Sequence, residues 1–256
     1  MYTLGIDIGS TTSKCVILQD GEKLVAKSLQ LGGLGTEGPA DALTQLWHDS
    51  GLHREEMARV IVTGYGRNKF EGADGEVSEL TCHALGGRFV FPDLRTVIDI
   101  GGQDAKIISL TPDGRMSNFI MNDKCAAGTG RFLEVMANTL AVTPGDLCRL
   151  ARQGGGVAIS SMCTVFAESE VISLIGRGEA RENIAFAVVD SVVQKVSAQA
   201  GKLSDGSGTF CLTGGLCQCD FICEALEKAL GRPVQTCENG RFAGALGAAL
   251  SGLKKP

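Results

Sequence analysis

The sequence has no cluster of lysine and arginine and no long hydrophobic run. Its 24 basic and 29 acidic side chains give a formal charge of −5. A nucleic-acid-binding surface normally shows as a basic patch, so we expect no nucleic-acid partner. No apolar stretch approaches the ~18 residues of a membrane-spanning helix. Residues 1–9 include Asp7, which indicates a strand rather than a signal peptide. We therefore expect a cytoplasmic protein with no membrane partner.

Aromatic side chains make up only 5% of the chain, whereas glycine accounts for 35 of its 256 residues. Glycines at this density let other groups approach the backbone closely, as phosphate-binding loops require.

The three histidines, His48, His53 and His83, form no constellation. The motif G-x-x-x-x-G-K-[ST] is absent, which excludes a P-loop protein. A G-x-G-x-x-G occurs at 33–38, but no acidic residue ends the next strand, so it predicts a flexible loop rather than a dinucleotide site.

One pattern, an apolar strand with an aspartate before its final turn, occurs twice. Residues 5–9 read Gly-Ile-Asp-Ile-Gly, and residues 97–101 read Val-Ile-Asp-Ile-Gly. Antiparallel strands are expected after each, which makes a weak internal repeat. We expect two half-domains, 1–93 and 94–240, with a C-terminal helix at 241–256 that packs back on the first. The second half is mostly helical in pattern, with short strands expected at 157–160, 209–213 and 234–236.

The turn after the first copy has the composition of a phosphate-binding hairpin. Its glycine permits close approach of a phosphate, and its hydroxyls are hydrogen-bond donors. Lys14 adds a point charge for the terminal phosphates. Asp7, at the strand end, suits Mg²⁺ bound through water. The predicted nucleotide-binding residues of this turn are Gly9, Ser10, Thr11, Thr12, Ser13 and Lys14.

The second copy supplies the same ingredients, so two such hairpins facing each other would clamp a nucleoside triphosphate. A further turn, with Gly214 and Gly215, follows a strand and precedes a helix, as an adenosine- or phosphate-binding turn does. Phosphoryl transfer relies chiefly on positioning and charge stabilisation. We therefore expect Asp7, Gln103 and Asp104 to position Mg²⁺ and the attacking water. The predicted nucleotide-binding residues of the second hairpin are Asp99, Gly101, Gly102 and Gln103.

Two longer blocks carry a resemblance to a known family. Residues 121–134 read MNDKCAAGTGRFLE, and residues 160–170 read SSMCTVFAESE. Both are similar to the activator ATPases of 2-hydroxyacyl-CoA dehydratases and to the related ATPase subunits of benzoyl-CoA reductases. The hairpins resemble the wider actin-like superfamily of sugar kinases, heat-shock ATPases and actin. The resemblance, which runs over 5–250, implies an α/β actin-like ATPase fold of two ribonuclease-H-like half-domains, with mixed sheets flanked by helices.

The resemblance also implies a cofactor and partners. Members of the family are homodimers with one [4Fe–4S] cluster, and the matching ligands here are Cys125 and Cys163 of each chain. A cubane cluster needs four thiolates, so two chains complete the set. Reduced ferredoxin or flavodoxin would load the cluster. ATP hydrolysis with Mg²⁺ would then drive an electron to a 2-hydroxyacyl-CoA dehydratase or a related acyl-CoA reductase, leaving ADP. Arg241 stands where the family often has glutamine, and we expect it to stack on adenine.

Two other functions stay open at this point: a small-molecule kinase of the same superfamily without a cluster, and a nucleotide-dependent filament former. The remaining cysteines receive weaker assignments. Cys217, Cys219 and Cys223 form C-x-C-x-x-x-C, which fits no common zinc or cluster spacing, although a metal site is possible. Helix packing accounts for Cys82. The cysteines interpreted as core or incidental are Cys15, Cys148, Cys211 and Cys237.

Overall fold

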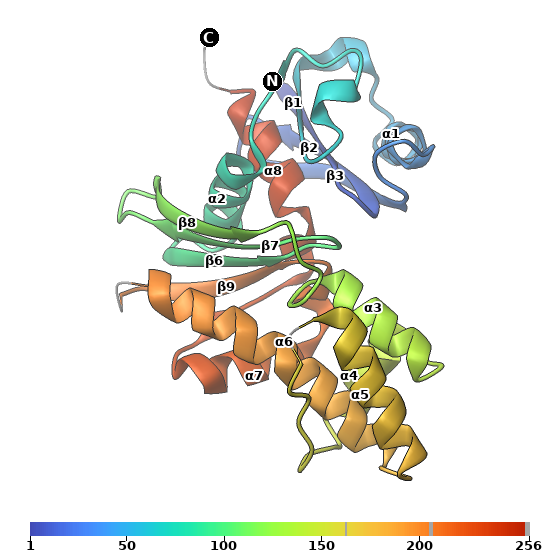
Figure 1. The fold of residues 1–256 in the computed structure, drawn as a ribbon. Helices are drawn as coiled ribbons and strands as arrows, with labels where there is room; N and C mark the ends of the chain where they lie inside the picture. The colour runs from blue at the N-terminus through green and yellow to red at the C-terminus, as the bar shows by residue number, and fades with distance from the viewer. Residues whose placement is uncertain (162, 205–206, 254–256) are drawn as a thin grey trace. The chain divides into compact units, whose positions relative to one another are not determined.

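The structure is a computed structural model that describes residues 1–161, 163–204 and 207–253. It contains two five-stranded sheets with helices packed on them (Figure 1), which confirms the predicted α/β class. Met162, in the second predicted cysteine block, and residues 254–256 of the predicted C-terminal helix lie outside the described residues. No helix of the described part of the chain combines the length and the apolar character that crossing a membrane requires.

The two sheets have the same topology. Their strand orders are β3-β2-β1-β4-β5 and β10-β9-β6-β7-β8, so reading the second in reverse matches β6 with β1, β7 with β2 and β9 with β4. The strands are β1 Tyr2–Ile8, β2 Thr12–Gln19, β3 Lys23–Leu31, β4 Met57–Thr63, β5 Gly75–Glu76, β6 Leu94–Ile100, β7 Ala105–Leu110, β8 Met116–Asn122, β9 Thr209–Gly214 and β10 Val234–Gln235. The weak sequence repeat therefore corresponds to a repeated sheet.

The second half is mostly helical, as the sequence pattern indicates. The α-helices are α1 Gly38–Ser50, α2 Glu79–Val90, α3 Gly130–Thr139, α4 Pro144–Ala151, α5 Thr164–Gly176, α6 Arg181–Leu203, α7 Asp220–Leu230 and α8 Ala243–Ser251. The short 3₁₀ helices are η1 Arg54–Glu56, η2 Arg67–Lys69, η3 Gly215–Gln218 and η4 Glu238–Phe242. The strand predicted at 157–160 is wrong. The Ser160 N–H donates to Glu170 Oε2 at 2.8 Å, a side-chain partner instead of a neighbouring strand.

The chain folds into two compact units. The first comprises 1–97, 110–117 and the chain from 239 onward, and the second comprises 98–109 and 118–238. The half-domain limits expected from the sequence stay a prediction.

In the first unit, alternate side chains of β2 enter different cores. Cys15 and Ile17 pack with Leu46 of α1, whereas Val16 and Leu18 pack with residues of α8 such as Leu246. This period of two places α1 on one face of the sheet and α8 on the other (Figure 1).

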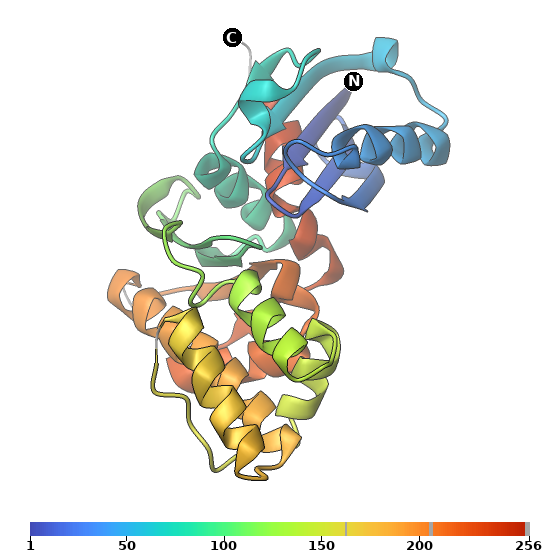
Figure 2. The same ribbon diagram turned by 45° about the vertical axis from the view of Figure 1, so that its right-hand side comes forward.

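The core of the second unit is built around α6. Val188, Val192 and Val196 of this helix belong to one buried cluster with Leu133 of α3 and Leu147 of α4. Figures 1 and 2 both show α3, α4 and α5 gathered beside α6. The helices that follow the two predicted cluster cysteines are therefore parts of one packed body.

Helix α8 packs so closely that it depends on glycine. A Cβ added to Gly247 would overlap the backbone carbonyl of Cys82 in α2. We expect Gly247→Ala to lower the free energy of unfolding by about 1–3 kcal/mol, the usual range for overpacking. Gly201 of α6 is the matched control, because a Cβ there meets nothing within 4 Å. Gly201→Ala should leave the free energy of unfolding unchanged or raise it by up to about 1 kcal/mol, and the melting temperature should follow. Equal melting temperatures of the two variants would contradict this account of α8.

Candidate nucleotide-binding and cysteine sites

The first hairpin joins β1 to β2 through a tight turn. The Gly9 N–H donates to Thr12 O at 3.0 Å. Asp7 is only 5% exposed, and its Oδ2 lies 3.5 Å from Lys14 Nζ on the neighbouring strand. Ser10, Thr11 and Thr12 line the turn, and Thr11 is exposed. Ser13 is buried, and its hydroxyl donates to Gly32 O at 2.9 Å, so of these four hydroxyls it is the one used inside the fold.

The loop predicted as flexible packs against this hairpin. The Leu34 N–H donates to Gly9 O at 3.1 Å, and the Gly32 N–H donates to Thr11 O at 2.8 Å. A Cβ on Gly33 would overlap the Gly9 carbonyl. Gly33 thus permits close approach to the first hairpin, whereas Gly35 has open space around it.

The second hairpin repeats this geometry around a buried lysine. The Gly101 N–H donates to Asp104 O at 2.9 Å, as Gly9 does to Thr12. Lys106 Nζ lies 2.7 Å from Asp104 Oδ2 and 3.3 Å from Asp99 Oδ2. All three side chains are at most 4% exposed. Two buried carboxylates thus share one cation, which offsets part of the cost of removing them from water.

A threonine–glycine turn stands beside the aspartate in each half. Thr213 Oγ1 donates to Asp99 Oδ1 at 2.8 Å. Gly214 has φ +84°, and a Cβ there would clash with Ile100 O. Gly64, which follows Thr63, has φ +90°, and a Cβ there would clash with Ile8 O. Both positions need the left-handed conformation that glycine adopts without strain.

Sequence reasoning missed Lys106, and it included Thr213 in the turn with Gly214 and Gly215 without assigning it a role at Asp99. The signal for Lys106 was present, because it follows Asp99 at the same spacing at which Lys14 follows Asp7. Thr213 and Thr63 each directly precede a glycine at the end of a strand. Their positions beside the aspartates depend on β9 and β4 lying next to β6 and β1, which only strand pairing decides.

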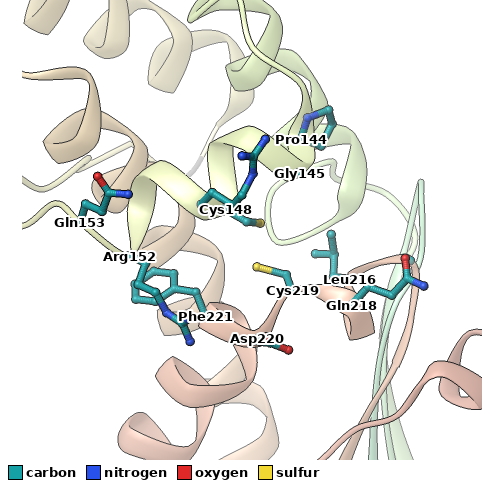
Figure 3. Close-up of a pocket in the computed structure, with 12 residues that line it drawn as sticks. Pro144, Gly145, Cys148, Arg152, Gln153, Leu216, Gln218, Cys219, Asp220 and Phe221 are labelled. Atoms are coloured by element: carbon teal, nitrogen blue, oxygen red, sulfur yellow. The ribbon is translucent and has the colours of Figure 1, made fainter.

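A pocket of about 470 Å³ lies in the second unit, between α4 and the chain that follows β9. Figure 3 shows Leu216 and Gln218 on one side and α4 on the other. Gly215 also lines it, which places one residue of the predicted adenosine turn at its wall. Gln103 is exposed beside the second hairpin, and Arg241 is half-buried in η4 of the first unit.

The two predicted cluster cysteines are both exposed and both precede helices. Cys125 lies in the loop between β8 and α3, where Asn122 Nδ2 donates to the carbonyls of Cys125 and Ala127, each at 2.9 Å. Cys163 is the N-cap of α5, and its carbonyl accepts from the Ala167 N–H at 2.9 Å. The described residues of a single chain contain no group of three or more His, Cys, Asp or Glu side chains placed to hold a metal ion.

Helix α3 is attached directly to the second hairpin. The Gly130 N–H donates to Gly101 O at 2.9 Å, and the Arg131 N–H donates to Gly102 O at 2.8 Å. These bonds satisfy two of the N–H groups that a helix start leaves without an internal partner. At its other end α3 contacts α5, where Thr139 Oγ1 donates to Glu168 Oε1 at 3.0 Å.

Comparison with known proteins agrees with this arrangement. Residues 4–252 match the model of the BadF/BadG/BcrA/BcrD ATPase family. The chain belongs to this ATPase family. It is 50% identical over 257 residues to the (R)-2-hydroxyglutaryl-CoA dehydratase activating ATPase of Acidaminococcus fermentans, covering 100% of this chain and 98% of that protein. The predicted resemblance and the predicted ATPase are thereby confirmed.

Solved structures of the BadF/BadG/BcrA/BcrD ATPase type and of more distant proteins share the fold. The activator of the 2-hydroxyisocaproyl-CoA dehydratase from Clostridium difficile, with bound ADPNP, has a TM-score of 0.93 at 44% identity, covering 98% of this chain and 94% of that one. A glucokinase from Streptomyces griseus has a TM-score of 0.62 at 14% identity, covering 97% and 98%. The glucokinase supports the actin-like fold alone, so the kinase alternative gains nothing further from it.

The buried lysine of the second hairpin generates a stability prediction. Lys106→Met leaves the carboxylates of Asp99 and Asp104 buried without this cation, and loss of one partner of a buried ion pair costs about 3–5 kcal/mol. We expect a loss of that size in chemical denaturation of the apoprotein. Lys124→Met is the control, because Lys124 is 89% exposed beside Asp123. Exposed pairs contribute little, so its unfolding midpoint should stay close to the wild-type value. Equal midpoints for the two variants would show that the buried pairing adds no stability.

Proposed function

We propose that this ATPase is an electron-transfer activator: ATP hydrolysis at the two hairpins drives one low-potential electron to a 2-hydroxyacyl-CoA dehydratase or a related acyl-CoA reductase. The observation that best supports this proposal is the pair of hydrogen bonds from α3 to Gly101 and Gly102, since α3 follows the Cys125 loop. The relatives at 50% and 44% identity are named as dehydratase activators. Ferredoxin or flavodoxin is the proposed electron donor, and we propose the cytoplasm as the compartment, where thiols stay reduced.

The cysteines fit a cluster shared by two chains. Cys125 and Cys163 are exposed thiols, as ligands to a group outside the chain must be. Four thiolates are needed and one chain offers two, so we propose a homodimer with a twofold axis through the site. When bound, a [4Fe–4S] cluster supplies a one-electron carrier. The N-terminal end of α5 favours negative charge beside Cys163.

An apolar surface supports the dimer. Val165 is 67% exposed, Phe166 is 66% exposed and Ile172 is 56% exposed, all on the helix that begins after Cys163. Large apolar side chains gathered on one exposed element mark interaction sites more often than free surface. A second copy of the chain would cover this face and bring its own cysteines to the cluster.

The nucleotide would be held by backbone and buried charge. We propose that the phosphates bind the N–H groups and hydroxyls of residues 9–14 and of residues 101–103. Mg²⁺ would lie near Asp7 and Asp104, and Gln103 would orient the attacking water. The adenosine would lie at Gly214 and Gly215, beside the pocket that Leu216 lines, with Arg241 as a further adenine contact. The C. difficile activator, which has the same fold, was solved with bound ADPNP, and this supports a nucleotide site in this chain.

Coupling would run through α3. A change in the second hairpin on loss of the terminal phosphate pulls on the carbonyls of Gly101 and Gly102, which hold the first turn of α3. Movement of α3 displaces the loop that carries Cys125. Because α3 also contacts α5 through Thr139 and Glu168, the same movement reaches Cys163. Both proposed ligands thus respond to one hairpin, as a small shift amplified by a packed helix pair would allow.

The cluster assignment predicts a metal content. Anaerobically purified protein should appear in native mass spectrometry as a dimer with four iron and four sulfide, by analogy with cubane sites. Cys125→Ser and Cys163→Ser should each lose the cluster, because each removes two of the four thiolates in a symmetric dimer. Cys237→Ser is the control and should keep it. An iron-free monomer after anaerobic reconstitution, or a normal cluster in either ligand variant, would disprove the shared site.

The hydrolytic assignment predicts a rate effect without a stability effect. Gln103 is exposed, so Gln103→Ala should keep the wild-type melting temperature. Loss of a group that positions the attacking water should slow ATP turnover by about two orders of magnitude, as loss of one transition-state hydrogen bond does. Gln194→Ala, at an exposed position on α6, is the control and should turn over normally. Full turnover in Gln103→Ala would remove this residue from the proposed mechanism.

A further inference from the structure

The pocket beside Gly215 contains two facing thiols. Cys148 comes from α4 and Cys219 from the residue before α7, and both line the 470 Å³ space. Figure 3 shows the two sulfur atoms directed into the gap between these walls. Cys148 is 7% exposed, and Cys219 is half-buried. The two residues are far apart in the sequence. The sequence analysis therefore interpreted Cys148 as core or incidental and Cys219 as part of the C-x-C-x-x-x-C motif.

The two thiols have different chemistry. Hydrogen bonding with the facing Cys148 thiol holds the pKa of Cys219 below its usual value, although burial opposes this shift. The backbone N–H groups of Phe221 and Ile222, at the start of α7, also lower the pKa of Cys219. The Ile222 N–H donates to the Cys219 carbonyl at 3.0 Å. Hydrogen bonding with Cys219, together with burial, raises the pKa of the Cys148 thiol. A thiolate at a helix N-terminus is the reactive form of cysteine, and a buried neutral thiol is not.

Three other cysteines, Cys15, Cys82 and Cys223, have the opposite pKa shift. Burial raises the pKa of Cys15 and of Cys82 to about 12. Cys223, one turn into α7, has its pKa raised to about 11 by burial, and its thiol donates to Val234 O at 3.0 Å. Cys219, at the N-cap of α7, therefore differs from Cys223 inside that helix in both the direction of its pKa shift and its hydrogen bonding.

We propose that Cys148 and Cys219 are a redox-active dithiol, a modification site that small-molecule disulfides oxidise reversibly. The Cys219 thiolate attacks one sulfur of the disulfide, forms a mixed disulfide and releases one thiolate. Cys148 then loses its proton and attacks the Cys219 sulfur, which forms the Cys148–Cys219 bond and releases the second thiolate. The two cysteines give up two electrons, and the small disulfide takes them. The proton of Cys148 and one proton from solvent, which replaces the one that Cys219 lost on ionising, end on the two released thiols.

The disulfide would bridge the walls of the pocket. Gly215 and Leu216 line the same space as the two sulfurs, so a covalent bond from α4 to the start of α7 would fix its width. This consequence rests on the proposed function, since it requires adenosine beside Gly214 and Gly215. Oxidation would then lower nucleotide affinity, and a dithiol reductant would restore it. Formation of the disulfide itself does not depend on any nucleotide.

The test uses the full-length protein, purified without oxygen and incubated with oxidised glutathione. Free thiols are then alkylated, and the protein is digested and examined by mass spectrometry. We expect a peptide cross-linked between Cys148 and Cys219, with loss of two alkylatable thiols per chain, reversed by dithiothreitol. Cys148→Ser should instead accumulate glutathione on Cys219, because the second thiol is missing. Cys217→Ser and Cys223→Ser are the matched controls and should cross-link as the wild type does.

Two results would overturn the proposal: no Cys148–Cys219 cross-link in the wild-type protein at any ratio of oxidised to reduced glutathione, or no glutathione adduct on Cys219 in Cys148→Ser. Binding of a fluorescent ADP analogue to oxidised and reduced protein tests the consequence separately. Equal affinities would overturn the coupling to nucleotide and leave the disulfide in place. Failure of the cross-link leaves the ATPase and iron assays untouched, so the two proposals fail separately.

Discussion

Two backbone hydrogen bonds, from Gly130 to Gly101 and from Arg131 to Gly102, connect the start of α3 to the second hairpin. Helix starts leave N–H groups without partners, and here the carbonyls of a phosphate-type hairpin supply two of those partners. The start of α3 is thus bonded directly to the second hairpin. The Cys125 loop leads into α3, and α5, which α3 contacts, begins after Cys163, so this contact underlies the coupling proposed above.

The two sheets have the same topology, but their hairpins carry different buried charges. In each half a buried aspartate ends the central strand, and a glycine with positive φ follows the strand beside it. The first half pairs Asp7 with Lys14 at 3.5 Å. In the second half Lys106 neutralises two carboxylates, Asp99 and Asp104, within 3.3 Å. The second hairpin thus carries the more heavily buried charge, and its geometry has less freedom to relax.

The pocket wall joins two kinds of chemistry that the sequence kept apart. Gly215, from the turn after β9, lines the same space as a thiol from α4 and a thiol before α7. Gly215 contributes backbone to the lining of this pocket, and Cys148 and Cys219 contribute sulfur. Close packing of α4 and α7 in a common core with α6 is what brings the sulfurs together. An α-helix start beside one sulfur alone makes the pair asymmetric, and asymmetry is what a directed thiol exchange requires.

Local patterns determined much of this protein. Asp7 and Asp99 with their glycines marked the hairpins, apolar periodicity located most helices and strands, and the blocks around Cys125 and Cys163 identified the family, because each of these signals lies in a few consecutive residues. Tertiary structure alone decided the rest. It placed Lys106 between two carboxylates, Thr213 against Asp99, the 33–38 loop on Gly9 and Cys148 opposite Cys219. Segment 157–160 was misjudged for the same reason: Ser160 bonds to Glu170 across a turn, and a partner chosen by folding leaves no mark in the local sequence.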